Sequence, residues 1–388
     1  MSKKAYIGIN GVARQIKKGY IGVDGVARKI KKGYIGIGGV ARPFWSGGEL
    51  TYYGTITGLS DPRGLLAATS IGNYALFAGG YSDETNNSTT VDAYNKSLTR
   101  STPTVLYTGR FELAATTVEG YALFGGGIKS TETQKRVDAY NSSLTRSIKN
   151  LTTARHELAA TTVGSYALFG GGETSNNYGT TNKVEAVNGS LTVSSVTGLN
   201  ASSTKLAATT IGGYALFAGG RNGSGDAITQ VTAYDASLTR SIPTQLTIAR
   251  AGGATSVGNY AIIAGKNPYS SDEVGAVSEV YDASLTHSVT SALSVDKEMF
   301  ASGTVGNYAL FGGGYGGGPY SGQKSILSTV DAFDDSLTRT TPTALSVARC
   351  SLAAATIGNF LLFAGGEDSS GGYASSGKLD TVDVYTIA

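Results

Sequence analysis

The feature that most constrains this chain of 388 residues is a sevenfold internal repeat. Its most regular part is a short aromatic and aliphatic run that ends in two glycines or a close variant. The seven copies are spaced by 45 to 52 residues and begin at Tyr74, Tyr121, Tyr166, Tyr214, Tyr260, Tyr308 and Phe360. A repeat of this length is usually one supersecondary unit that buries its apolar faces only against its neighbours. We therefore predict a repeat architecture.

Each repeat contains four short segments with strand character. Small residues such as Leu113-Ala-Ala-Thr-Thr-Val come first and the aromatic run second. A variable stretch then leads to Val-Asp-Ala-Tyr-Asn, at Val91 in the first copy, and to Ser-Leu-Thr-Arg, at Ser97. Gly72-Asn73 between the first two segments suits a two-residue hairpin turn. We predict four antiparallel strands per repeat, with the small residues innermost because bulk does not fit there.

The two ends of the repeat region complement each other. The last copy, from Val382 to Ala388, stops after its third segment, whereas residues 49–57 resemble the fourth. We expect residues 49–57 to pair with the last repeat and to close a ring, because closure removes the exposed edge of an open sheet.

The double glycine after an aromatic strand, then Val-Asp-Ala-Tyr, an outer strand and an arginine such as Arg110 or Arg155, resembles the kelch repeat. The resemblance covers residues 49–388. It implies an all-β fold, a seven-bladed kelch-like β-propeller over residues 46–388 with a short N-terminal β-hairpin repeat segment. The outer strand carries Leu-Thr-Arg where kelch blades commonly have tryptophan, which leaves the subfamily open.

Residues 1–45 repeat with a period of 14, in units of the form Tyr-Ile-Gly…Gly-Val-Ala-Arg that begin at Tyr6, Tyr20 and Tyr34. Asn10-Gly11 and the equivalent pairs are strong hairpin signals, so we predict three hairpins, with Ile9 opposite Val12 in the first. This segment holds ten Lys/Arg and one acid, whereas the rest of the chain holds 21 basic and 27 acidic residues. Its Lys-Lys pairs suit a solvated ribbon edge better than nucleic acid, and we predict no nucleic-acid partner.

These 14-residue units resemble repeats near the N-termini of tail-associated proteins of bacteriophages and prophages. The resemblance implies that residues 1–45 attach to other virion proteins or form a homo-oligomer, with Tyr6, Tyr20 and Tyr34 as attachment residues. Phage fibres are often trimers, so it also implies a trimer. The implied location is the virion tail after synthesis in the bacterial cytoplasm. The N-terminus has no signal-peptide pattern, and we expect no membrane insertion.

The composition disfavours catalysis. The single cysteine, Cys350, and two histidines, His156 and His287, offer little to metal or redox chemistry, and we predict no catalytic residues, metal or cofactor. We read the two histidines as surface or packing residues that do not meet. The acids of the Val-Asp-Ala-Tyr segments recur with arginines once per repeat, which suggests a structural bridge between blades.

The links between the second and third segments vary in length and sequence, whereas the other turns are nearly constant. They are rich in Tyr, Asn, Ser and Gly, a composition that suits recognition of glycan or protein but is also common in exposed loops without a ligand. The candidate ligand-binding residues are Tyr81, Asp83, Tyr178, Arg221, Tyr269, Tyr315, Tyr320 and Tyr373.

These observations predict a non-enzymatic bacteriophage virion protein of the tail-fibre, baseplate or receptor-binding type. It would attach through its N-terminus and bind a host-surface glycan or protein through the variable propeller face. The alternatives are a cytoplasmic protein-interaction propeller and a carbohydrate-active enzyme. The enzyme would require clustered carboxylates on the variable face.

Overall fold

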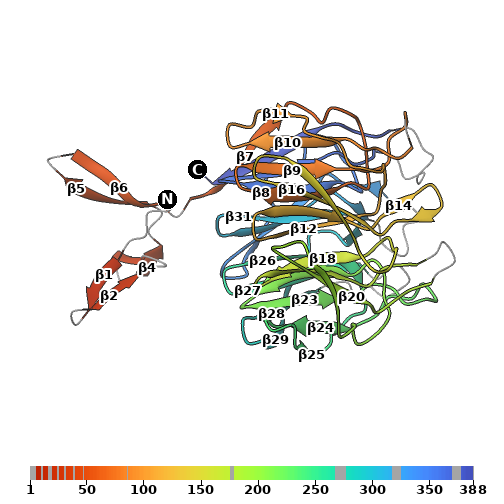
Figure 1. Ribbon diagram of the computed structural model, residues 1–388. Coiled ribbons are helices and arrows are strands. Elements are labelled where there is room, and N and C mark those ends of the chain that lie inside the picture. The colour runs from red at the N-terminus through yellow and green to blue at the C-terminus, as the bar shows by residue number, and fades with distance from the viewer. Residues whose placement is uncertain are drawn as a thin grey trace. The chain divides into compact units, whose positions relative to one another are not determined.

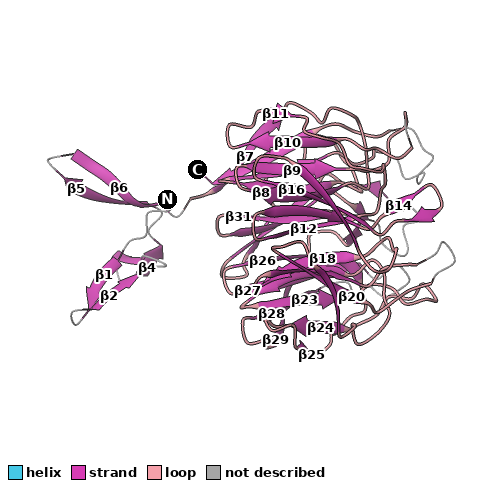
Figure 2. Ribbon diagram, in the orientation of Figure 1, coloured by secondary structure: helices cyan, strands magenta, loops and turns pink. Residues whose placement is uncertain are grey.

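The fold is described from a computed structural model, and the regular structure of its described residues is all β-strand (Figures 1 and 2). No helix long and apolar enough to cross a membrane occurs among the described residues. Contacts divide the chain into two compact units, Met1–Thr51 with Ile387–Ala388, and Tyr52–Thr386. The structure describes residues 6–9, 12–15, 20–23, 26–29, 32–37, 40–46 and 48–387 without 85, 175–178, 267–276, 317–324 and 369–376, and side chains from residue 48 onward except Lys266.

The described residues of the N-terminal unit form three antiparallel hairpins. In the first hairpin Ile9 pairs with Val12 and Tyr6 with Gln15, the register that a two-residue Asn-Gly turn predicts. The third hairpin has an irregularity between Gly33 and Tyr34. The hairpins are β1 (Tyr6–Ile9) with β2 (Val12–Gln15), β3 (Tyr20–Val23) with β4 (Val26–Lys29), and β5 (Lys32–Ile37) with β6 (Val40–Ser46).

The second unit contains, in its described residues, seven four-stranded antiparallel sheets. From the first strand of each repeat outward they are β8 (Ala67–Ile71), β9 (Tyr74–Ala78), β10 (Val91–Asn95) and β11 (Arg100–Ser101); β12 (Ala114–Val118), β13 (Tyr121–Gly125), β16 (Arg136–Asn141) and β17 (Arg146–Asn150); β18 (Ala159–Val163), β19 (Tyr166–Gly170), β20 (Val184–Asn188) and β21 (Val193–Val196); β22 (Ala207–Ile211), β23 (Tyr214–Ala218), β24 (Val231–Tyr234) and β25 (Arg240–Ser241); β26 (Ala251–Val257), β27 (Tyr260–Lys266), β28 (Val277–Asp282) and β29 (His287–Ser291); β31 (Ala301–Val305), β32 (Tyr308–Gly312), β35 (Val330–Asp334) and β36 (Arg339–Thr340); and β37 (Ala353–Ile357), β38 (Phe360–Ala364), β39 (Val382–Ile387) and β7 (Leu50–Ile56). Short strands in the connections are β14 (Ile128–Lys129) with β15 (Glu132–Thr133), and β30 (Lys297–Glu298) with β33 (Tyr315–Gly316) and β34 (Ser325–Ile326).

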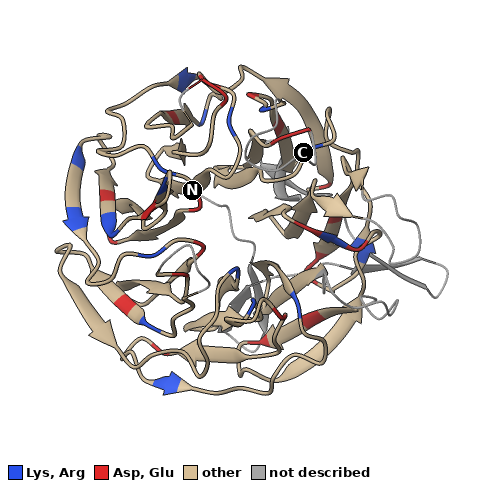
Figure 3. Cartoon of the chain, turned by 90° about the vertical axis from the view of Figure 1, so that its right-hand side faces the viewer, with Lys and Arg blue, Asp and Glu red and all other residues tan. Residues whose placement is uncertain are grey.

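The innermost strands of neighbouring sheets contact one another in sequence order, and β37 of the last sheet contacts β8 of the first. Figure 3 views this unit along the axis that these strands surround. Hydroxyl groups link them: Thr162 Oγ1 donates to Thr117 O at 2.5 Å, and Thr356 Oγ1 to Thr304 O at 2.6 Å. The arrangement is consistent with a β-propeller.

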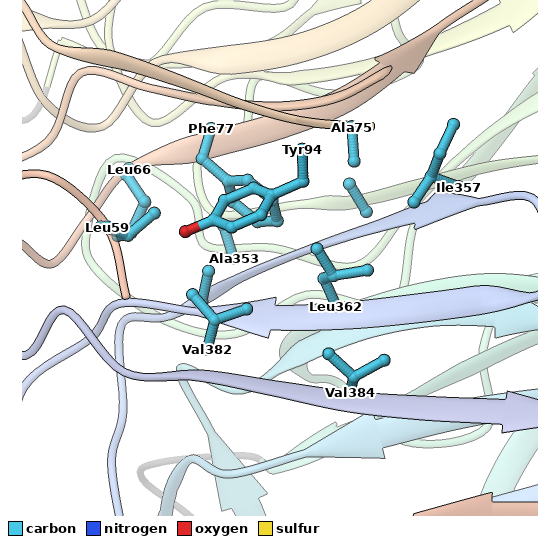
Figure 4. Close-up of a cluster of buried hydrophobic side chains, with 12 residues drawn as sticks. Leu59, Leu66, Ala75, Phe77, Tyr94, Ala353, Ile357, Leu362, Val382 and Val384 are labelled. Carbon is cyan, nitrogen blue, oxygen red and sulfur yellow. The ribbon is translucent and has the colours of Figure 1, made fainter. Parts of the chain in front are cut away.

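The core lies between adjacent sheets. In the cluster of Figure 4, Phe77 and Tyr94 of the first sheet pack with Leu362 and Val384 of the last, and all four are fully buried. The second strands carry apolar side chains on both faces because each is covered by a neighbouring sheet on either side. Burial of this apolar surface is the main favourable contribution to the stability of such an arrangement.

The last sheet takes its outer strand from the beginning of the repeat region, since β7 lies beside β39. The Tyr52 hydroxyl donates to Asp383 Oδ1 at 2.5 Å, and the Leu59 amide donates to Asp380 O at 2.7 Å. Residue numbers rise along β7 in the direction in which they fall along β39, so these two strands are antiparallel.

The Ser-Leu-Thr-Arg segment forms a turn rather than a full strand, which corrects the sequence interpretation. Asn95 Oδ1 accepts from the amides of Ser97 and Thr99 at 2.9 and 3.0 Å, and Leu98 has a left-handed backbone with φ of 58°. The outer strand begins only at Arg100. The carboxamide satisfies the turn amides that would otherwise lack partners, and the same turn recurs in the other repeats.

A buried arginine precedes the innermost strand in most sheets and pairs with an acid of the third strand. Arg110 Nη2 lies 2.8 Å from Asp138 Oδ2, and both side chains are fully buried. The pair itself lies within one sheet. The Arg110 carbonyl, however, accepts from the Gly80 amide of the preceding sheet at 2.9 Å, so the residue does join two sheets. The equivalent pairs are Arg63–Asp92, Arg155–Glu185, Arg250–Glu279, Lys297–Asp331 and Arg349–Asp383.

Candidate functional site

A cavity of about 350 Å³ opens where the innermost strands begin. Arg221, which lines it, directly follows the double glycine of its repeat, so the cavity lies at the edge of the sheets that carries the links between second and third strands. Figure 3 looks onto this face. The cavity combines apolar and charged groups, and its lining is Leu65, Leu66, Glu112, Leu113, Glu157, Leu158, Lys205, Leu206, Arg221, Ala251, Gly252, Glu298, Met299, Phe300, Ser351 and Leu352.

A backbone annulus positions the charged groups. Six non-glycine residues, one from each of six sheets, have left-handed backbones with φ between 51° and 57°, a conformation that costs roughly 1–2 kcal/mol per residue. Hydrogen bonds between their peptide groups offset part of this cost. The residues are Leu65, Glu112, Glu157, Lys205, Met299 and Ser351. The bonds, of 2.8 to 3.1 Å, run from the amides of Leu65 to Ser351, Glu112 to Leu65, Glu157 to Glu112, Lys205 to Glu157, and Ser351 to Met299.

The annulus is interrupted at the fifth sheet, where Gly252 lies within the longer strand β26. A Cβ atom at this position would lie 2.0 Å from Ala264 O, so the close strand pairing requires glycine. Arg221 of the fourth sheet spans the gap and its Nη2 lies 3.1 Å from Glu298 Oε2 of the sixth. This ion pair connects two sheets that are not neighbours.

Acidic groups gather around His156 on the adjoining wall. His156 Nε2 lies 3.8 Å from Glu112 Oε2 and 3.9 Å from Glu173 Oε2, and ligand atoms of His156, Glu157 and Glu173 lie within 4.8 Å of one another. Glu157 also contacts Lys205, whose Nζ is 2.9 Å from Oε1. Burial lowers the pKa of His156, which favours the neutral imidazole, and burial together with the charge of Glu157 raises the pKa of Glu173.

A second polar cluster belongs to the last sheet. Glu367 accepts from the Ser351 hydroxyl and from Lys378 Nζ, each at 2.7 Å. Lys378 Nζ also lies 5.4 Å from the centre of the Tyr81 ring, in cation–π geometry. Cys350 is buried beside this cluster, and burial raises its pKa to about 11, so the thiol is not an activated nucleophile at neutral pH.

Three residues predicted from the loops lie at the cavity or directly beside its lining. Arg221 lines it, Tyr81 forms a bridge with Gly64 next to Leu65, and Tyr315 pairs with Glu298. Asp83 is exposed in the turn that follows Tyr81. Tyr178, Tyr269, Tyr320 and Tyr373 lie outside the described residues, and of Tyr6, Tyr20 and Tyr34 only the strand backbones are described.

Sequence reasoning missed the residues on which the cavity depends, namely Glu112, Glu157, Lys205 and Glu298. It also treated the two histidines alike. His156 is 6% exposed and belongs to the acidic wall, whereas His287 lies in the outer strand β29 with its Nε2 2.6 Å from Glu279 Oε2. An alignment of the repeats could have found these residues. At the two positions before the inner-strand leucine or its equivalent, the charge of the side chain differs from repeat to repeat, whereas the flanking residues change little.

Comparisons with known proteins bear on the fold. No protein-family model matches the chain, and no curated protein matches its sequence. Among solved structures, that of YjhT is similar, with a TM-score of 0.56 and 13% sequence identity. The match covers 86% of this chain and 97% of YjhT. At this identity the likeness concerns the fold alone, and it agrees with an all-β architecture of the propeller kind.

Proposed function

We propose that the chain is a non-enzymatic bacteriophage virion protein, of the tail-fibre, baseplate or receptor-binding type. In this proposal the seven sheets are blades of one kelch-like propeller, residues 1–45 attach it to other tail proteins, and the propeller binds a host-surface glycan or protein. The virion assignment rests on the resemblance of the 14-residue repeats. The binding assignment rests on one observation, the cavity at the face of the variable links.

The lining of the cavity favours a small polar ligand such as one or two sugar units. Carboxylates and guanidinium groups hydrogen-bond to hydroxyl groups, while leucines such as Leu113 and Leu158 offer contact to the apolar face of a sugar ring. The Arg221–Glu298 pair is partly exposed, with side-chain exposures of 17% and 18%. It therefore retains access to a ligand while each charge remains compensated.

The direction of β7 agrees with such a role. Its Tyr52 lies beside Tyr385, near the end of β39, and Gly58 lies near Asp380, close to the start of β39. The strand thus begins at the edge that carries the two-residue turns, whereas the cavity opens at the other edge. Attachment through the segment before β7 would leave the chain's entry point away from the binding face.

A carbohydrate-active enzyme is the second candidate, and a specific observation favours it. Glu112, Glu157 and Glu173 cluster at the cavity wall, which is the feature that this alternative requires. The raised pKa of Glu173 is also a property of general acids in glycosidases. Glu157, however, is already engaged by Lys205 and by the Thr204 hydroxyl at 3.0 Å.

An array of bacterial surface-polysaccharide fragments, probed with the labelled full-length chain, tests the proposal. We expect binding to a subset of fragments, at least tenfold weaker for Arg221→Gln. The matched control is Arg240→Gln, which removes the same charge from an exposed outer strand and should bind like the wild type. Mass spectrometry of the recovered fragments separates the candidates, since cleaved glycans would indicate the enzyme. Absence of glycan binding, with capture of a soluble bacterial protein, would favour the interaction propeller.

A further inference from the structure

The acidic wall of the cavity contains the donor atoms of a metal site. His156 Nε2 faces Oε2 of both Glu112 and Glu173, at 3.8 and 3.9 Å, and a carboxylate oxygen of Glu157 lies within 4.8 Å. These separations exceed hydrogen-bond length, so direct hydrogen bonds do not explain why the three carboxylates gather around this ring. Mutual repulsion of the carboxylates opposes such a cluster, and Lys205, whose Nζ lies 2.9 Å from Glu157 Oε1, compensates part of their charge.

The imidazole provides an independent indication. His156 is 94% buried, since its exposure is 6%, and among the described residues its Nδ1 has no hydrogen-bond partner. Burying a polar ring without hydrogen bonds costs free energy. The other histidine, His287, avoids this cost through its 2.6 Å contact with Glu279. Nε2, the nitrogen that faces the carboxylates, lies beyond hydrogen-bond length from both Glu112 and Glu173, so an ion bound there would offset part of the cost of burying the ring.

We propose that His156, Glu157 and Glu173 bind one divalent transition-metal ion, with Glu112 beside it. One imidazole and two carboxylates form a donor set that Zn²⁺ accepts, at about 2.0–2.2 Å per ligand. Two donors on a tetrahedral ion are then roughly 3.4 Å apart. The 3.9 Å between His156 Nε2 and Glu173 Oε2 thus requires a contraction of about half an ångström, and the 4.8 Å limit for the whole group requires a contraction of at most about 1.4 Å.

The position of the site gives the ion access to the cavity. Glu112 and Glu157 line the cavity, so an exchangeable coordination position would face it. Lys205 compensates Glu157 in the metal-free protein, and because its side chain is 43% exposed it can turn toward solvent when an ion binds. Three protein ligands and one open position are typical of zinc sites that bind a further oxygen ligand. This inference does not depend on the proposed function.

Titration of the untagged full-length chain with Zn²⁺, after dialysis against a chelator, tests the proposal by calorimetry. A polyhistidine tag would bind the ion itself and must be absent. We expect one equivalent to bind and the thermal unfolding temperature to rise, because an ion that binds only the folded state stabilises it. Glu173→Gln and His156→Gln should each weaken binding at least tenfold.

The second histidine supplies a matched control. His287→Gln removes the same side chain from another histidine–glutamate pair, and it should bind Zn²⁺ within twofold of the wild type. Far-UV circular dichroism identifies any variant that fails to fold, and the wild-type titration stands without the variants. The proposal is overturned if folded wild type binds no stoichiometric Zn²⁺, or if binding persists within twofold in both site variants.

Discussion

The buried arginine–acid pairs lead to a quantitative prediction, because one sheet of this chain lacks the pair. In the fourth sheet Ser203 and Thr232 occupy the equivalent positions, and both are fully buried. Gln230 Nε2 donates to Ser203 Oγ at 2.5 Å, and Thr232 Oγ1 donates to Asn200 Oδ1 at 2.7 Å. Equivalent buried positions are thus occupied by a charged pair in six sheets and by neutral hydrogen-bonded side chains in the fourth.

Arg110→Ser in the second sheet would remove one partner and leave the other. Arg110 donates to Asp138 Oδ2 and to the carbonyl oxygens of Thr108, Phe124 and Gly126 at 2.8 to 3.0 Å. Asp138 would keep the Tyr107 amide at 3.0 Å and a more distant Arg146. Breaking a buried ion pair by removing one partner costs about 3–5 kcal/mol. We expect a loss of this size in the free energy of unfolding.

The double variant Arg110→Ser/Asp138→Thr copies the residues of the fourth sheet. It removes the unpaired buried carboxylate, so we expect it to be about 2 kcal/mol more stable than Arg110→Ser alone, despite carrying one more substitution. Asp138→Thr alone, which leaves the guanidinium unpaired, completes the double-mutant cycle. If the two groups compensate each other, the double variant should have a higher free energy of unfolding than Arg110→Ser.

Urea denaturation followed by far-UV circular dichroism measures these differences. Tryptophan fluorescence is unsuitable because the single tryptophan, Trp45, belongs to the N-terminal unit. The reasoning is refuted if Arg110→Ser loses less than about 1 kcal/mol, a change typical of ordinary substitutions. It is equally refuted if the double variant is as unstable as the sum of the single variants, since the two groups would then act independently.

Two further predictions concern assembly and the buried thiol. Light scattering should find the full-length chain as a defined oligomer and a chain starting at Gly48 as a folded monomer; two monomers would contradict assembly through residues 1–45 and favour the interaction propeller. Cys350 is 3% exposed with a pKa raised to about 11, so iodoacetamide at pH 8 should label it only after unfolding, and rapid labelling of the native protein would contradict its burial.

Much of the strand arrangement could be predicted because the same pattern of strand and turn residues occurs in seven copies. A two-residue Gly-Asn turn fixes the pairing of Ile71 with Tyr74, and the alternation of large and small residues then fixes the faces. The Ser-Leu-Thr segment was misassigned because β-propensity took precedence over the preceding Asn95 or its equivalent. An Asx residue two positions before such a serine is itself a turn signal, and it outweighs strand propensity there.

The candidate site was harder to predict, since it depends on contacts between residues from different repeats. Arg221 and Glu298 are 77 positions apart, and nothing local in either segment indicates that they meet. The prediction that the chain binds no metal rested on its two histidines and stays untested. The site proposed here needs only one imidazole together with carboxylates.

The annulus explains why variable side chains occur at constant backbone positions. Packing fixes the buried arginine or its substitute on one side of these positions and the inner-strand leucine on the other, while peptide hydrogen bonds hold the residues between them. The residue directly before the leucine or its equivalent lines the cavity in all seven segments, so its side chain can differ between repeats at little cost to the core. Departures from the repeat therefore mark the chemistry of the site. The seven segments are Arg63-Gly-Leu-Leu, Arg110-Phe-Glu-Leu, Arg155-His-Glu-Leu, Ser203-Thr-Lys-Leu, Arg250-Ala-Gly-Gly, Lys297-Glu-Met-Phe and Arg349-Cys-Ser-Leu.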